Sequence, residues 1–99
     1  MDYNFSDELI LSLHQTIGAN VKRLRVKRGL SQLELAYAMG NKSVSLISSA
    51  ELASDKKKFN TEHLYKIATI LNVDICEFFE GMEKGGKRFL VTTTTITPT

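Results

Sequence analysis

The 99-residue sequence predicts an all-helical protein. One observation is a recurring pattern of helix-start residues, in which capping side chains are flanked by apolar residues at the spacing of capping boxes and hydrophobic staples. The other is the return of apolar residues every three or four positions over most of the chain. Because both signals coincide at successive helix starts, they support the fold class more strongly than any single start does.

The first helix is expected to follow Ser6 and to reach Arg28. Ser6 can cap it, and two acids follow in the first turn, where the helix dipole favours negative charge. Gly18 weakens the middle of this segment by about 1 kcal/mol relative to alanine, so the segment is either one long helix or two helices with a break near Gly18. Gly29 is suited to end it. The expected apolar face consists of Leu9, Ile10, Leu13, Ile17, Val21 and Leu24.

Two short helices joined by a tight turn are expected in SQLELAYAMGNKSVSLISSAE, residues 31–51. Ser31 and Glu34 have the spacing of a capping box, and Gly40 is expected to stop the second helix. Ser43 is the expected N-cap of the third helix. The residues expected to face the core are Leu35, Ala36, Met39, Leu46, Ile47, Ala50 and Leu52.

A polar, basic loop then leads to Asn60, which is the expected cap of a fourth helix. Leu64, Ile67, Ala68 and Leu71 follow the i, i+3, i+4, i+7 rule and form its core stripe. A short last helix is expected from Asp74 to about Glu80. After Gly81 the sequence becomes rich in threonine and β-branched residues, which is compatible with a β-strand or with a disordered tail.

Composition argues against several classes of protein. The single cysteine, Cys76, allows no intramolecular disulfide and no cysteine-based zinc site, and it is expected to be a small buried residue. No apolar run approaches the roughly 18 residues of a membrane span, and the acidic N-terminus lacks the basic region of a secretory signal. His14 and His63 have no acid or cysteine at a metal-binding spacing. A cytoplasmic protein that is not an enzyme and has no cofactor is therefore expected.

The positive charges are clustered although the net charge is only +2. Five of the seven residues from Lys22 to Arg28 are basic, and Lys56, Lys57 and Lys58 form a second cluster. Such clusters suit a polyanion, and the alternative is a solvated charged face. Glu51 is expected to pair inside the domain with a base such as Arg23.

The sequence also resembles a known family. The run Gln32, Leu35, Ala36, Gly40, Ile47, Ser48 and Glu51, followed by Leu64, Ile67, Ala68 and Leu71, is similar to helix-turn-helix domains of the Cro and phage-repressor type, also called the xenobiotic-response-element family. The resemblance covers about residues 17–80. It implies a five-helix, lambda-repressor-like DNA-binding bundle whose third helix lies in the major groove. Residues 1–16 then form an N-terminal helical extension, and residues 81–99 form a tail.

The resemblance also implies a DNA-binding site, in which Gln32 holds a phosphate. The candidate residues are Gln32, Lys42, Ser43, Val44, Ser45, Ser49, Lys56, Lys57, Lys58 and Asn60. The sequence departs from the family pattern by one extra residue between Gly40 and Ile47. Its third helix has no arginine, glutamine or asparagine, the side chains that read bases most strongly, so specificity is expected to depend on DNA shape or on dimer spacing.

These inferences together predict a sequence-specific transcriptional regulator, a repressor or operon controller. Its expected partner is double-stranded DNA, with no association with membranes. It is expected to act as a homodimer built from the last helix, the N-terminal helix, the tail strand or a combination of these. The alternative is a protein-interaction or antitoxin-like module that uses the helix-turn-helix as a scaffold. In that case the N-terminal helix or the tail engages a protein partner.

Overall fold

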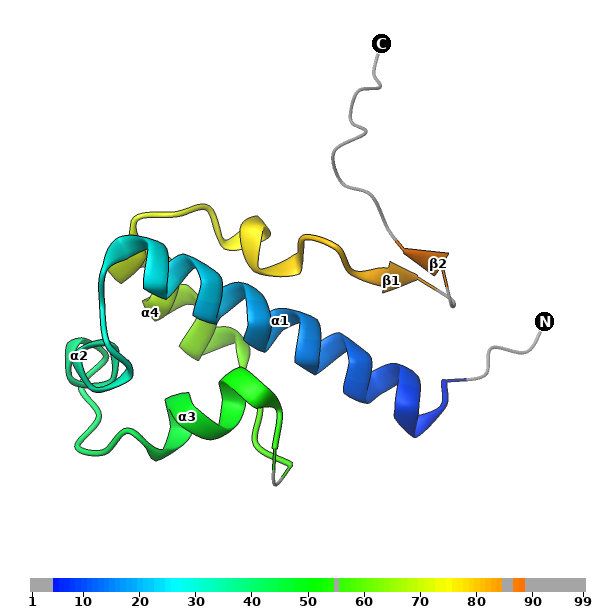
Figure 1. The fold of residues 1–99 in the computed structure, drawn as a ribbon, viewed down its shortest axis with the longest axis horizontal. Helices are drawn as coiled ribbons and strands as arrows, with labels where there is room; N and C mark the ends of the chain where they lie inside the picture. Colours follow the sequence, from blue (N-terminus) through cyan, green and yellow to red (C-terminus); the bar gives the residue numbers. More distant parts are fainter. Residues whose placement is uncertain (1–4, 55, 85–86, 89–99) are drawn as a thin grey trace, which may run out of the picture.

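The fold was obtained as a computed structural model that describes residues 5–54, 56–84 and 87–88 (Figure 1). Within these residues the chain forms four α-helices, one 3-10 helix and a pair of two-residue strands. The elements are α1 (Asp7–Arg28), α2 (Gln32–Ala38), α3 (Ser45–Leu52), α4 (Thr61–Leu71), η1 (Ile75–Phe79), β1 (Glu83–Lys84) and β2 (Lys87–Arg88). The all-helical class is confirmed, whereas a fifth α-helix is not, because the last helical segment is the 3-10 helix η1.

The long helix α1 is continuous through Gly18, so the two-helix alternative is wrong. The Ser6 hydroxyl accepts a hydrogen bond from the backbone N–H of Leu9 at 3.1 Å, and Gly29 ends the helix in the left-handed conformation. Buried residues of α1 begin only at Ile17. The N-terminal half of α1 therefore extends beyond the core, as Figure 1 shows. The predicted boundary between residues 16 and 17 lies inside this helix, and the division of the chain there stays a prediction.

The core lies where the second half of α1 meets α2, α3, α4 and η1. Phe78, Leu35, Ile47, Ile67 and Val21 are its largest fully buried side chains. Most of the residues that the apolar pattern assigned to the core are buried. Packing of these apolar faces is expected to be the main source of stability for such short helices. The full set of buried apolar residues is Ile17, Val21, Leu24, Leu35, Ala36, Met39, Ile47, Ala50, Phe59, Leu64, Ile67, Ala68, Leu71 and Phe78.

Gly18 allows α1 and α3 to approach each other very closely. A Cβ atom at this position would lie 2.5 Å from the carbonyl oxygens of both Ala50 and Glu51, which belong to the α3 backbone. Real Cβ atoms essentially never come so near, and backbone atoms cannot rotate away as a side chain can. The glycine that weakens α1 as a helix is therefore required by the packing of α3 against it.

Three expectations for individual residues are wrong. Ser43 does not cap the third helix, because α3 begins at Ser45 with Val44 in the cap position. Leu52 does not face the core but is 65% exposed, since it shares the outer face of α3 with Ser45. Cys76 is exposed in η1 rather than buried, because η1 turns Phe78 instead into the core.

The expected strand in the tail is not confirmed. β1 and β2 form a two-residue antiparallel pair, in which Glu83 lies opposite Arg88. Most of the predicted strand, residues 89–99, lies outside the described residues.

Candidate nucleic-acid interface

Local hydrogen bonds define the pair of helices α2 and α3. The Ser31 hydroxyl accepts from the Glu34 N–H at 3.0 Å, and the Glu34 carboxylate accepts from the Ser31 N–H at 2.8 Å, so the predicted capping box is present. Gly40 has φ +91°, a conformation that side chains rarely adopt. The Asn41 N–H then donates to the Ala36 carbonyl at 2.9 Å. The chain thereby reverses within a few residues and enters α3.

The outer face of α3 is short and carries hydroxyl groups. Ser45, Ser48, Ser49 and Leu52 share this face by their spacing of three and four residues. Two of its hydroxyls are already engaged. The Ser45 hydroxyl is hydrogen-bonded to that of Ser43 at 2.9 Å, and the Ser48 hydroxyl donates to the Ser45 carbonyl at 3.3 Å. Leu52 was not predicted to be part of this surface, although its helical spacing from Ser45 was the signal that could have identified it.

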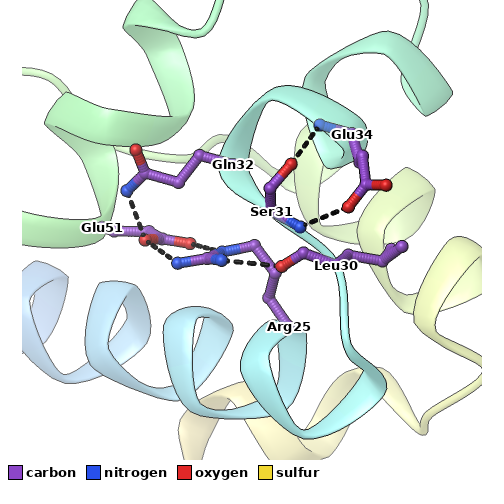
Figure 2. A network of polar contacts seen from close by, with 6 residues as sticks. All are labelled: Arg25, Leu30, Ser31, Gln32, Glu34 and Glu51. Atoms are coloured by element: carbon purple, nitrogen blue, oxygen red, sulfur yellow. Dashed lines mark hydrogen bonds and ion pairs between the residues drawn. The ribbon is translucent and has the colours of Figure 1, made fainter.

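A buried ion pair connects α1 to the end of α3 (Figure 2). The Arg25 Nε donates to Glu51 Oε2 at 2.7 Å, and its Nη2 donates to Glu51 Oε1 at 3.0 Å. The side chains are only 8% and 1% exposed. The Arg25 Nη1 also donates to the Leu30 carbonyl at 2.8 Å, so the guanidinium links α1, the α1–α2 connection and α3.

The partner of Glu51 was predicted to be a base such as Arg23, and that choice is wrong. Arg23 instead lies 3.3 Å from the Glu80 carboxylate and donates to Asn20. Arg25 follows Val21 by four residues and so shares the buried face of α1, whereas Arg23 points away from it. Two of the five basic residues in the first cluster, Arg23 and Arg25, thus form ion pairs within the protein.

Gln32 lies at the start of α2 and is held by the same network. Its amide Nε2 donates to Glu51 Oε1 at 2.9 Å. A glutamine amide has two N–H donors, so this contact uses one hydrogen and orients the other. Gln32 is half-buried, and its position is therefore coupled to the ion pair through Glu51.

Four exposed lysines lie near the two ends of α3. Lys42 is in the turn before the helix and Lys56, Lys57 and Lys58 are in the loop after it, and all four are exposed. Eight helical residues separate these ends by about 12 Å. An open hollow beside Lys42 is lined by residues 40–43, Ser45 and Leu46. In Figure 1 the turn before α3, the helix itself and the loop after it follow one side of the molecule. The side chains of the three loop lysines also line a hollow beside the N-terminal half of α1.

Asn60 acts as a helix cap. Its side-chain oxygen accepts from the His63 N–H at 2.7 Å, and its own N–H donates to His63 Nδ1 at 3.1 Å. Partial burial lowers the pKa of His63, which favours the neutral ring that can accept this bond. Asn60 begins α4 just beyond the basic loop, at the margin of the site.

Among the described residues, no group of histidine, cysteine and acidic side chains is arranged to hold a metal ion. The part of the chain that the structure describes also contains no helix that is both long and apolar enough to span a membrane.

Comparison with known proteins identifies one family. A model of the helix-turn-helix family matches residues 21–78, more than half of the chain. The match begins at Val21 in the C-terminal part of α1 and continues through α2, α3 and α4 to Phe78 in η1. No curated protein matches the sequence.

Proposed function

Since this chain belongs to the helix-turn-helix family of the Cro and phage-repressor type and is thus a DNA-binding regulator, we propose that it binds a specific operator as a homodimer. It acts there as a repressor or operon controller, by occluding or positioning polymerase. A cytoplasmic location is part of this proposal. The observation that carries the proposal is that exposed lysines lie at both ends of α3, with Lys42 in the turn before the helix and three lysines in the loop after it.

In the proposed complex, the outer face of α3 enters the major groove and the flanking lysines hold phosphates. Lys42 and the loop lysines lie at opposite ends of a helix about 12 Å long, so they can contact the backbone on either side of the groove. Gln32 donates its second amide hydrogen to a phosphate while Glu51 holds the first. Phosphate contacts of this kind set the register of a protein on DNA.

Base recognition on this surface is chemically limited. Serine hydroxyls donate to or accept from several bases, and Val44 and Leu52 offer apolar contact to a thymine methyl group. A larger share of specificity is therefore expected from DNA shape and from the spacing of two half-sites.

The proposal is tested by selecting ligands from a random duplex library and then measuring the affinity of the selected DNA by fluorescence anisotropy. We expect enrichment of a two-fold symmetric sequence with half-sites about one helical turn apart. The logarithm of the association constant should fall linearly with the logarithm of salt concentration. Absence of both enrichment and salt-dependent binding would contradict the proposal.

Lys42→Ala and Gln32→Ala are each expected to weaken binding to the selected DNA by roughly 10-fold, because each removes a hydrogen bond to a charged group. The Lys42 change should also reduce the salt slope by about 1. Lys66→Ala serves as the control, since Lys66 lies on α4 and pairs with Glu62. If both test variants bind as tightly as the wild type, α2 and α3 are not docked as proposed.

Lys57→Gln combined with Lys58→Gln is expected to weaken specific and random duplexes by a similar factor, and to reduce the salt slope by about 2. Lys56 is left unchanged because its φ of +59° makes it a poor site for a clean substitution. Affinity for both duplexes is measured across the same salt series. A loss confined to the selected sequence would instead assign these lysines to base recognition.

A further inference from the structure

The N-terminal half of α1 turns one face towards the basic loop. Asp7, Ile10, Leu11 and His14 lie on this face by their spacing of three, four and seven residues. Together with Ala53 and the three loop lysines they line a hollow of about 250 Å³. Figure 1 shows this part of α1 extending past the other helices. The carboxylate of Asp7 and the charges of the loop lysines therefore share one hollow within a single chain.

Asp7 is the acid that is placed to act on the loop lysines. Among the described residues that line the hollow, it is the only acid. Glu8 is also exposed in the first turn of α1, but it does not line the hollow, because successive helical residues point about 100° apart. None of the three lysines forms an ion pair with a described residue. The Asp7 charge thus acts on them across the hollow rather than through a direct ion pair.

His14 adds a second acceptor on the same face of α1. Within the described residues, its buried Nδ1 atom has no hydrogen-bond partner. Burial and then the charge of Lys58 lower the pKa of His14, which favours the neutral ring whose nitrogen can accept a hydrogen bond. A lysine ammonium has three donors and no acceptor. The hollow therefore offers the loop lysines a carboxylate and an imidazole nitrogen as alternatives to a phosphate.

We propose that this face of α1 is an intramolecular competitor for the loop lysines, and that Asp7 thereby lowers the affinity of the protein for DNA. This inference rests on the proposed function, because it takes Lys57 and Lys58 as phosphate contacts. The Asp7 carboxylate and a phosphate attract the same ammonium groups, and the carboxylate also repels a phosphate that approaches the loop. Since phosphate contacts carry no sequence information, Asp7 weakens binding to every duplex alike and limits binding to random DNA.

The test compares Asp7→Asn with Glu8→Gln in the full chain. Both variants remove one acid from the first turn of α1, so they change the net charge and the helix-dipole interaction equally. Anisotropy is measured with the selected duplex and with a random duplex at about 50 mM salt, where charges are weakly screened. Asp7→Asn should tighten binding to both duplexes by roughly 3-fold, because it removes one unit charge that faces the loop. Glu8→Gln should change the affinity by less than about 1.5-fold, because its charge points away from the hollow and is screened by water.

Two further measurements locate the effect at the lysines. In a chain that carries Lys57→Gln and Lys58→Gln, Asp7→Asn should lose most of its effect, because the two changes then act on the same missing contacts. Raising the salt concentration to about 0.5 M should also remove most of the difference between Asp7→Asn and Glu8→Gln. Equal affinities for Asp7→Asn and Glu8→Gln would overturn the inference, and so would a gain that persists without the two lysines.

Retention on a heparin column gives a readout that does not require an operator, because heparin sulfates attract the same lysines. Asp7→Asn should elute at a higher salt concentration than Glu8→Gln, and identical elution would overturn the inference. If the wild type binds no DNA, the proposed function fails, while the heparin comparison still decides whether Asp7 restrains the lysines. Circular dichroism verifies that each variant is folded.

Discussion

Glu51→Ala is expected to lower the free energy of unfolding by about 3–5 kcal/mol. The substitution leaves the Arg25 guanidinium buried without its carboxylate, since the two side chains are only 8% and 1% exposed. It also removes the acceptor that holds Gln32 at 2.9 Å. A buried charge that loses its partner costs far more than a broken ion pair at the surface, where water replaces the lost contact.

Urea denaturation followed by circular dichroism measures this effect. Glu62→Ala is the matched control, because Glu62 forms an exposed ion pair with Lys66 one helical turn away, and its loss should cost about 0.5 kcal/mol or less. Arg25→Met combined with Glu51→Leu should recover most of the stability, since it removes both charges together. A loss below 1 kcal/mol for Glu51→Ala would show that the ion pair does not determine how α1 and α3 are held together.

The helix starts and the core are the parts of the fold that could be predicted from the sequence. The starts of α2, α4 and η1 were predicted from Ser31, Asn60 and Asp74, and each of these residues caps its element. Capping depends on residues only three positions apart, so it can be predicted from the local sequence. The spacing of apolar residues every three or four positions likewise identified the core, because a helix with one buried face requires apolar residues at that spacing.

The wrong partner for Glu51 illustrates a contact between distant segments. Composition places Arg23 and Arg25 in the same basic cluster, and only the rotation of α1 determines that Arg25 meets Glu51, 26 residues away. The engagement of Gln32 by that carboxylate likewise depends on how α2 packs near the end of α3. Leu52 was assigned to the core by its apolarity, whereas the packing of α3 leaves it on the outer face, where it is 65% exposed. The candidate DNA residues were chosen from a family resemblance, and their roles stay proposals.

Gly18 is the position where local propensity and packing make opposite predictions. Replacing a mid-helix glycine by alanine should stabilise an exposed helix by about 1 kcal/mol. Here the added Cβ would lie 2.5 Å from two carbonyl oxygens of α3, and overpacking of this kind costs typically 1–3 kcal/mol. Because the obstructing atoms are backbone, we expect Gly18→Ala to lower the free energy of unfolding by about 2 kcal/mol overall.

The neighbouring change Ala19→Gly separates the two effects, since Ala19 is exposed on the same helix. It should also destabilise the protein, by about 1 kcal/mol, but only because glycine has a lower helix propensity than alanine. A methyl group is thus unfavourable at position 18 and favourable at position 19. Gly18→Ala can be accommodated only if α3 shifts away from α1, and α3 carries the proposed reading surface. DNA affinity should therefore fall even at temperatures where the variant is fully folded, and a variant more stable than the wild type would disprove the close contact.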